Sequence, residues 1–209
     1  PPSAARACQP AAGAGAAGGA GPGGRRGRMP DYAPGRDYRA VLSERMRPRR
    51  DRLRPSGHQA KAYVDHGWML DRAAGARAGI GWLGKNTNLL VPGVGSYVVL
   101  SEIVTSAEIE PDSPSAKSCG SCQACLRACP TGALIAPGVL DNRKCISFWT
   151  IEHHGVIPLD VRPLLGDWVF GCDLCQEVCP VNAYPRRAEP DPAATPAFGP
   201  HKVSGRPRL

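Results

Sequence analysis

Eight cysteines in the second half of the chain are the residues best suited to chemistry. The first run has gaps of two, two and three residues and is followed by a proline: Cys119, Cys122, Cys125 and Cys129. The second run ends with the same spacing and a proline, but its first member lies far upstream: Cys145, Cys172, Cys175 and Cys179. This spacing matches the bacterial pattern for [4Fe–4S] clusters, in which the cysteine before the proline ligates the other cluster. The cysteines therefore predict two clusters and a protein that transfers electrons.

By this rule each cluster takes ligands from both runs. The predicted ligands of cluster 1 are Cys119, Cys122, Cys125 and Cys179, and those of cluster 2 are Cys129, Cys145, Cys172 and Cys175. Zinc is an alternative, but it is held by C-x2-C pairs rather than by this spacing. Disulfides would need a secreted chain, and no signal peptide is visible. Cys8 lies in a head rich in Ala, Gly and Pro and is not expected to be a ligand.

Most of the positive charge lies near the N-terminal end. The formal net charge is +8, and residues 25–54 contain eleven arginines against four acidic residues, a net +7. Such a block either contacts phosphates or forms a solvated helix face, and charge alone favours neither. The sequence has no apolar run of about 18 residues. We therefore expect a cytoplasmic protein without a membrane partner.

Composition divides the chain into four parts. These are a disordered head (1–28), a mixed α/β domain (29–112), a ferredoxin-like two-cluster domain (113–185) and a flexible tail (186–209). The head lacks the large apolar side chains that a packed core requires. A polar linker over residues 105–118 leads into the cysteines.

Apolar spacing predicts the main elements of residues 29–112. A helix over residues 36–46 should end at Pro48, because proline cannot continue the backbone hydrogen bonds. A strand at residues 63–64 precedes a second helix, over residues 68–74, which Gly79 should end. The β-prone runs 87–91 and 96–104 are expected to pair as a hairpin around the turn 92–95.

A glycine-rich motif follows the second predicted helix. Residues 79–84 match G-x-G-x-x-G, and Lys85 comes directly after them. A dinucleotide site needs a strand before this motif and a helix after it, whereas here the predicted order is reversed. We therefore reject a Rossmann-type site and expect only that a ligand can approach the main chain beside Lys85.

Several short motifs occur in a fixed order around the cysteines. They are residues 32–38 (YAPGRDY), 64–65 (VD), 71–72 (DR), 77–86 (RAGIGWLGKN), 95–96 (GS), 143–147 (RKCIS), 150–152 (TIE) and 171–176 (GCDLCQ). In this combination the chain resembles the epoxyqueuosine reductases over about residues 31–182. That family uses cobalamin and iron–sulfur clusters to reduce the epoxide of epoxyqueuosine in the wobble position of tRNA.

The resemblance implies an α+β fold, in which a mixed α/β cobalamin-binding catalytic domain packs on a ferredoxin-like domain with two [4Fe–4S] clusters. The family usually has a longer N-terminal region, so we expect the catalytic domain here to be incomplete. It often has a histidine at the position of Arg39, and Ser/Thr-Ala-Pro where this chain has the residues 66–68 (HGW).

The resemblance also implies that Asp65 is the general acid that protonates the opening epoxide. Its apolar neighbours should raise its pKa by burial: Tyr63, Val64, Trp68 and Met69. The alternative is that Asp65 is an N-cap, because aspartate is favoured before a helix.

The positions expected to contact cobalamin, partly through backbone atoms, are Asn86, Leu89, Leu100, Ser147, Cys172 and Asp173. For Leu89 and Leu100, an ordinary place in the core is the better explanation from residue type alone. His154 and the arginines of residues 25–54 are candidates for contacts with tRNA, and a solvated loop explains His154 equally well.

The implied partners are the anticodon loop of tRNA, where bases can be splayed out, and an external electron donor. We expect a monomer. Three rival functions remain open: a corrinoid reductive dehalogenase, a plain two-cluster electron carrier of the ferredoxin type, and a nucleic-acid-binding protein with structural clusters.

Overall fold

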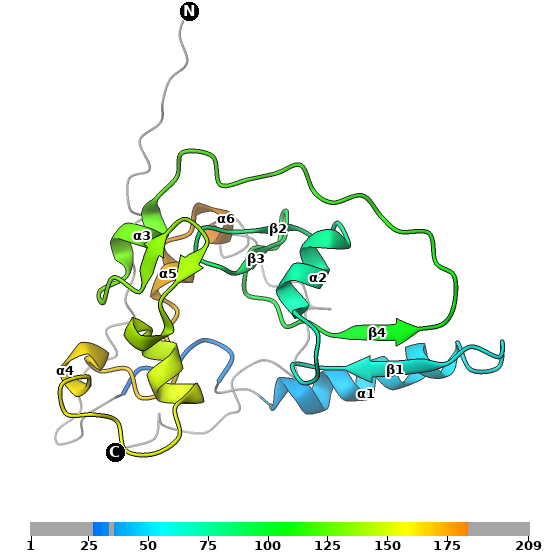
Figure 1. Cartoon of the computed structure of the whole chain (residues 1–209), viewed down its shortest axis with the longest axis horizontal. Coiled ribbons are helices and arrows are strands. Elements are labelled where there is room, and N and C mark those ends of the chain that lie inside the picture. Colours follow the sequence, from blue (N-terminus) through cyan, green and yellow to red (C-terminus); the bar gives the residue numbers. More distant parts are fainter. Residues whose placement is uncertain (1–26, 34–35, 184–209) are drawn as a thin grey trace, which may run out of the picture.

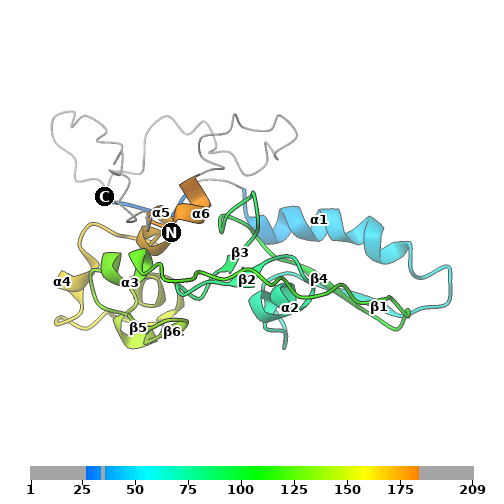
Figure 2. The same cartoon turned by 90° about the horizontal axis from the view of Figure 1, so that it is seen from above.

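The computed structural model describes residues 27–33 and 36–183 of the chain. In Figures 1 and 2 they form two neighbouring parts, one coloured blue to green and the other green to orange. Helices are mixed with short antiparallel strand pairs, in agreement with the expected α+β class. Residues 1–26 of the predicted head and the predicted tail (186–209) lie outside the described residues.

Arg28 was expected to belong to the disordered head, and this expectation is wrong. Its backbone forms a bridge with Trp168, with N–O distances of 2.7 Å to Asp167 and 3.0 Å from Val169. Its guanidinium lies 4.2 Å from the centroid of the Trp168 ring. A cation over an aromatic face is attracted to it, so local contacts order Arg28 although the sequence around it is rich in glycine.

The first part contains six elements. They are α1 (Tyr38–Asp51), β1 (Ala60–Tyr63), α2 (Asp71–Arg77), β2 (Trp82–Leu83), β3 (Leu89–Leu90) and β4 (Glu102–Thr105). β1 pairs antiparallel with β4, and Tyr63 lies opposite Glu102. α1 packs against β1, and its apolar residues Val41 and Leu42 are buried.

α1 runs through Pro48 to Asp51, so the prediction that Pro48 ends this helix is wrong. Proline in a helix removes one backbone hydrogen bond. The helix nevertheless continues, since the Pro48 carbonyl accepts a hydrogen bond from the Arg52 N–H at 3.2 Å. At the other end Asp37 caps α1 and accepts a hydrogen bond from the Arg39 N–H at 2.9 Å.

The predicted hairpin around residues 92–95 is also wrong. A tight turn does form there, with two hydrogen bonds between Val91 and Gly95. The flanking segments, however, pair elsewhere: β3 pairs with β2, and β4 pairs with β1. The glycine-rich motif has a helix before it and β2 within it, which confirms that the motif does not have the order of a dinucleotide site.

The second part holds the cysteines. Its elements are α3 (Ala124–Ala128), β5 (Leu134–Ala136), β6 (Val139–Leu140), η1 (Asn142–Lys144), η2 (Phe148–Glu152), α4 (Arg162–Leu165), α5 (Leu174–Glu177) and α6 (Pro180–Ala183). A small core of Ile146, Val161, Leu165 and Trp168 supports these elements. The predicted linker crosses from β4 to α3 without a helix or strand over residues 106–118, as Figure 1 shows.

Buried polar residues join the two parts. Ser96 and Asn182 exchange hydrogen bonds of 2.6 Å and 2.8 Å, although 86 residues separate them in sequence. Ser96 also donates to the Gln176 side chain at 2.8 Å. Within the described residues, no helix is both long and apolar enough to cross a membrane.

Candidate functional site

Four cysteines from separate segments line one pocket. The pocket has an empty volume of about 260 Å³, including open solvent at its mouth, and the four thiols are those of Cys119, Cys122, Cys125 and Cys179. These are the predicted ligands of cluster 1, and they come from both runs. The other residues around the pocket are Lys85, Asn86, Leu90, Ala124 and Pro180.

Local backbone features present the cluster 1 thiols. Gly120 has a φ of +48°, and the Cys122 N–H donates to the Cys119 carbonyl at 3.1 Å. This turn leads into α3, which carries Cys125. Cys179 precedes α6, where Pro180 occupies the first position, a place in which a missing N–H costs little. Burial raises the pKa of both Cys125 and Cys179, which disfavours the free thiolates, so these thiols would lose their protons only as they bind a metal.

The remaining four cysteines form a second set. Burial raises the pKa of Cys172 to about 11, and the nearby Cys145 and Cys129 thiols add to this effect. Burial likewise raises the pKa of Cys175 to about 12, with further contributions from Cys172 and Cys145. The structure thus brings together the predicted ligands of cluster 2. Cys125 also acts on Cys175, so the two sets are neighbours, as electron transfer between clusters would need.

Cys129 differs from its neighbours in this second set. Burial acts to raise its pKa, but hydrogen bonds outweigh that effect and lower the pKa. The donors include the Thr131 hydroxyl and the Ala133 N–H, which lies 3.3 Å from the sulfur. N–H donors around a sulfur are one of the means by which proteins tune iron–sulfur clusters.

The thiol arrangement suits a polynuclear cluster. Within the described part of the chain, no group of three or more His, Cys, Asp and Glu side chains could hold a single metal ion. In a [4Fe–4S] cluster each cysteine binds a different iron, so the thiols must surround a volume. The four thiols of cluster 1 line one pocket and so meet that requirement.

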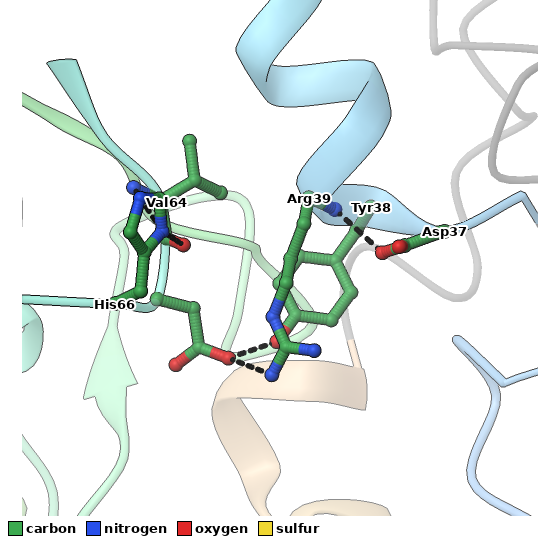
Figure 3. Close-up of polar contacts among 6 residues, drawn as sticks. Asp37, Tyr38, Arg39, Val64 and His66 are labelled. Carbon is green, nitrogen blue, oxygen red and sulfur yellow. Dashed lines mark hydrogen bonds and ion pairs between the residues drawn. The ribbon is translucent and has the colours of Figure 1, made fainter.

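Asp65 is held by two donors from α1. One of its carboxylate oxygens accepts hydrogen bonds from the Tyr38 hydroxyl and from the Arg39 guanidinium, the latter at 2.9 Å. Figure 3 shows Tyr38 and Arg39 extending side by side from the start of the helix, with their polar ends converging on the same oxygen. The Asp65 hydrogen bond and the negative charge of this carboxylate add to burial in raising the pKa of Tyr38.

Asp65 is neither buried, as the general-acid prediction expected, nor an N-cap, as the alternative expected. It is not an N-cap, because α2 begins at Asp71 with Leu70 before it and no side-chain cap. The expected burial is also wrong, since the Asp65 side chain is 46% exposed and Trp68 is 99% exposed. The backbone of Asp65 has a φ of +48°, a conformation that aspartate tolerates better than most residues. The loop therefore turns Asp65 outward toward Arg39.

Tyr32 connects Asp65 with the cysteine domain. Its ring makes edge contacts with Tyr38 at 5.8 Å and with Phe170 at 6.4 Å between centroids. Burial raises the pKa of Tyr32, and the charges of Asp173 and Asp65 add to this effect. The charges of the candidate acid and of one candidate cobalamin contact thus both act on this tyrosine.

Four of the six cobalamin candidates lie among or beside the predicted cluster 2 cysteines. Asn86 donates to the Cys175 carbonyl at 3.2 Å, and Ser147 donates to the Cys172 carbonyl at 3.4 Å. Asp173 follows Cys172 and accepts the Asp31 N–H at 2.8 Å. Burial raises the pKa of Asp173.

The burial of these candidates limits how they could meet a corrin. Asn86, Leu89 and Asp173 are 2–4% exposed, so this chain's own atoms cover their side chains. Leu89 lies close to Gly75, where an added Cβ would be 2.8 Å from its side chain, which supports the core explanation for Leu89. Leu100, Ser147 and Cys172 are partly exposed and fit a corrin surface better.

Sequence reasoning missed a carboxyl pair close to Asp65. Burial raises the pKa of Glu102 to about 7, and the charge and hydrogen bond of Asp71 contribute. One carboxylate oxygen of Glu102 is buried without a hydrogen-bond partner among the described residues. The sequence does not pair these two residues directly, because Glu102 lies in β4 and Asp71 lies at the start of α2, and only the fold brings them together. His154, by contrast, lies exposed after η2.

Comparison with known proteins begins with the cysteine domain. Residues 118–182 match the family of 4Fe-4S double cluster binding domains. The site thus belongs to the class of double-cluster iron–sulfur proteins. The chain is also 38% identical over 172 residues to the epoxyqueuosine reductase of Cellulophaga algicola, covering 81% of this chain and 55% of that protein. The chain is 40% identical over 186 residues to the epoxyqueuosine reductase of Synechocystis, covering 88% of this chain and 63% of that protein.

Solved structures give the same result. A crystal structure of epoxyqueuosine reductase with an epoxyqueuosine-modified tRNA-Tyr stem loop matches with a TM-score of 0.77 and 41% identity, over 85% of this chain and 46% of that one. A Bacillus subtilis epoxyqueuosine reductase, with its catalytic loop swung out of the active site, matches with a TM-score of 0.75, 40% identity and the same coverage. The resemblance to epoxyqueuosine reductases is confirmed. The chain spans about half the length of the curated relatives, between 39% and 63%.

Proposed function

We propose that this chain takes part in the reduction of epoxyqueuosine to queuosine in the wobble position of tRNA. The observation that carries the proposal is that Tyr38 and Arg39 converge on Asp65 in a chain whose cysteines from both runs line one pocket. Removing the epoxide oxygen as water consumes two electrons and two protons. The cysteine thiols, by holding the clusters, are suited to supply the electrons, and the Asp65 carboxyl is suited to supply a proton.

The cofactors that we propose are two [4Fe–4S] clusters and cobalamin. Bound to the chain, the clusters would supply single electrons and cobalamin the reaction at the epoxide carbon. The cluster 1 and cluster 2 thiols would hold the clusters with the ligand sets given above. Leu100, Ser147 and Cys172 would face the corrin, while Asn86 and Asp173 would fix the backbone behind it.

Asp65 is the proposed proton donor, and Tyr38 and Arg39 position it. An ionised carboxylate only accepts hydrogen bonds, so Asp65 must leave Arg39 and take up a proton from solvent before it can donate that proton to the substrate. The partial exposure of Asp65 supports such an exchange. The catalytic loop of the Bacillus subtilis relative, which swings out of its active site, supports it as well.

The proposed partner is the anticodon loop of tRNA, since a relative has been crystallised with a modified tRNA stem loop. His154 is exposed and remains a candidate contact. An external donor would supply the electrons to a cytoplasmic monomer. A plain electron carrier would not need the first part of the chain. The likeness to epoxyqueuosine reductases, in contrast, covers 85% of the whole chain.

The test is turnover of a defined substrate. Anaerobic protein with restored clusters, cobalamin and dithionite is incubated with a stem loop that contains epoxyqueuosine. Mass spectrometry should find queuosine, lighter by one oxygen. Intact epoxide after incubation with fully loaded protein would refute the proposal.

Replacing the acid provides the second arm of the test. Asp65→Asn should keep its clusters and cobalamin by spectrum but lose about 10²- to 10⁴-fold in rate. Asp112→Asn, in the exposed linker, is the matched control and should turn over normally. Near-normal turnover by Asp65→Asn would exclude the acid role while leaving the substrate assignment intact.

A further inference from the structure

Lys85 reaches from the glycine-rich motif into the cluster 1 pocket. Its ammonium donates hydrogen bonds to the Gly120 carbonyl at 2.6 Å and to the Cys122 carbonyl at 2.9 Å. It therefore holds both sides of the turn that presents Cys119 and Cys122. Lys85 also lines the same pocket as the four cluster 1 thiols.

The backbone around Lys85 is fixed from two directions. An added Cβ at Gly81 would lie 2.1 Å from the Leu90 carbonyl oxygen, and one at Gly84 would lie 2.6 Å from the Asn86 side-chain oxygen. Only glycine fits such close approaches. On the other side, the Gly138 N–H donates to the Lys85 carbonyl at 3.0 Å. The glycine-rich motif, which is not a dinucleotide site, thus places Lys85 beside the turn that carries Cys119 and Cys122.

We propose that Lys85 is a positioning residue for cluster 1 and that its charge makes this cluster easier to reduce than it would otherwise be. This inference rests on the two-cluster assignment of the proposed function. When the cluster gains one electron from a reductant, no bond breaks and no proton is needed, but its net charge becomes one unit more negative. A nearby ammonium stabilises that added charge, and charge near a cluster is a known means of setting its potential.

The experiment is a redox titration of anaerobic protein with both clusters restored. Lys85→Met removes the ammonium and keeps an unbranched side chain. Lys117→Met is the matched control, because Lys117 is exposed, lies close to the cysteines in sequence, and is not part of the pocket. Iron content and the two midpoint potentials are measured for each protein.

In Lys85→Met, one midpoint potential should fall by about 59 mV, which is tenfold in a one-electron equilibrium. The other midpoint, and both midpoints of Lys117→Met, should not move. Loss of cluster 1 alone, leaving about four irons, would also support the positioning role, provided that Lys85→Arg restores about eight.

Two results would overturn the inference. One is Lys85→Met with about eight irons and unchanged midpoints, and the other is an equal shift in Lys117→Met. If wild-type protein itself holds only one cluster, the two-cluster assignment fails instead. The iron content of wild type therefore separates the two failures.

Discussion

Arg39 gives the candidate acid an unusual neighbour. The guanidinium stays charged at all working pH values, so it holds the Asp65 carboxylate until another group displaces it. A histidine, which the resembled family often has at this position, could release the carboxylate simply by losing its proton. In the proposed reaction the substrate itself would have to separate Asp65 from Arg39, which would couple binding to acid catalysis.

The Glu102–Asp71 pair predicts a specific pH dependence of stability. The pKa of Glu102 is raised to about 7, so the folded state holds this proton more tightly than the unfolded state does. The corresponding stability is fully present below the unfolded pKa, near 4.5, and is lost as the pH rises toward 7. Glu102→Gln imitates the protonated form. It should therefore gain free energy of unfolding over wild type between pH 5 and pH 8, measured by urea denaturation.

Glu108→Gln is the control for this prediction, because Glu108 is exposed in the linker. Its free energy of unfolding should follow that of wild type at every pH. A constant difference between Glu102→Gln and wild type across the range would show that Glu102 does not share a proton with Asp71.

At the level of single residues, sequence spacing predicts ligands better than it predicts surroundings. The cysteine spacing predicted that Cys119 and Cys179 would share one site, because cluster geometry dictates the spacing, and both residues line one pocket. The partners of Asp65 could not be found in this way. Asp65 lies in the loop between β1 and α2, whereas Tyr38 and Arg39 lie on α1, and their approach depends on how α1 packs on β1.

The apolar residues near the start of α1 are buried, and the arginines that follow them are exposed. Val41 and Leu42 are buried against the sheet, whereas Arg45, Arg49 and Arg52 are exposed. Spacings of four and three residues place these arginines on one face. None of the three takes part in the ion pairs found among the described residues. Their charges are free to meet phosphates.

Replacing Arg45, Arg49 and Arg52 together by Gln should therefore weaken binding to a tRNA stem loop. Each phosphate contact releases counterions, so the salt dependence of binding should also become shallower. The slope of log K against log salt should fall by about 2. Fluorescence anisotropy at several salt concentrations measures both effects.

The matched control removes three positive charges elsewhere, by replacing Lys61, Arg77 and Lys117, all of which are exposed, with Gln. That protein should bind with nearly the wild-type slope. Equal losses in the two triple variants would mean that net charge alone attracts the RNA and that α1 has no special role.

Local signals predicted only some element boundaries, since α1 continues through Pro48 and α2 begins at Asp71 rather than at residue 68. Gly79 follows α2 with a φ of +72°, as its place after a helix suggested. The strand partners were not predicted, because residues 87–104 follow one another in sequence but pair with different strands. β4 pairs with β1 across about 40 residues of chain, and such long-range pairing is determined by packing rather than by a turn.

At the scale of the whole molecule, Asn182 is the main polar link between the two parts. It is 2% exposed and donates to Ser96 and to the Gln176 carbonyl, both at 2.8 Å. Gly95 lies against it, since an added Cβ there would be 2.3 Å from the Asn182 oxygen. The first part is thereby tied to the segment that carries Cys175 and Cys179.

Asn182→Ala should lower the free energy of unfolding by about 1–3 kcal/mol, because the Ser96 N–H and the Gln176 carbonyl would each lose a hydrogen-bond partner. Thermal or urea denaturation of the cluster-loaded protein measures the loss. Asn142→Ala, at an exposed position in η1, should change stability far less. Similar losses in both variants would show that the link between the two parts contributes little.

The interleaved ligand sets are the central claim, and paired cysteine substitutions test them most directly through iron content. Wild type should hold about eight irons. The double variant Cys119→Ser with Cys179→Ser removes two ligands of one cluster and should keep about four irons, whereas Cys119→Ser with Cys129→Ser strikes both clusters and should keep almost none. The reverse outcome, with four irons in the second variant and almost none in the first, would contradict the account.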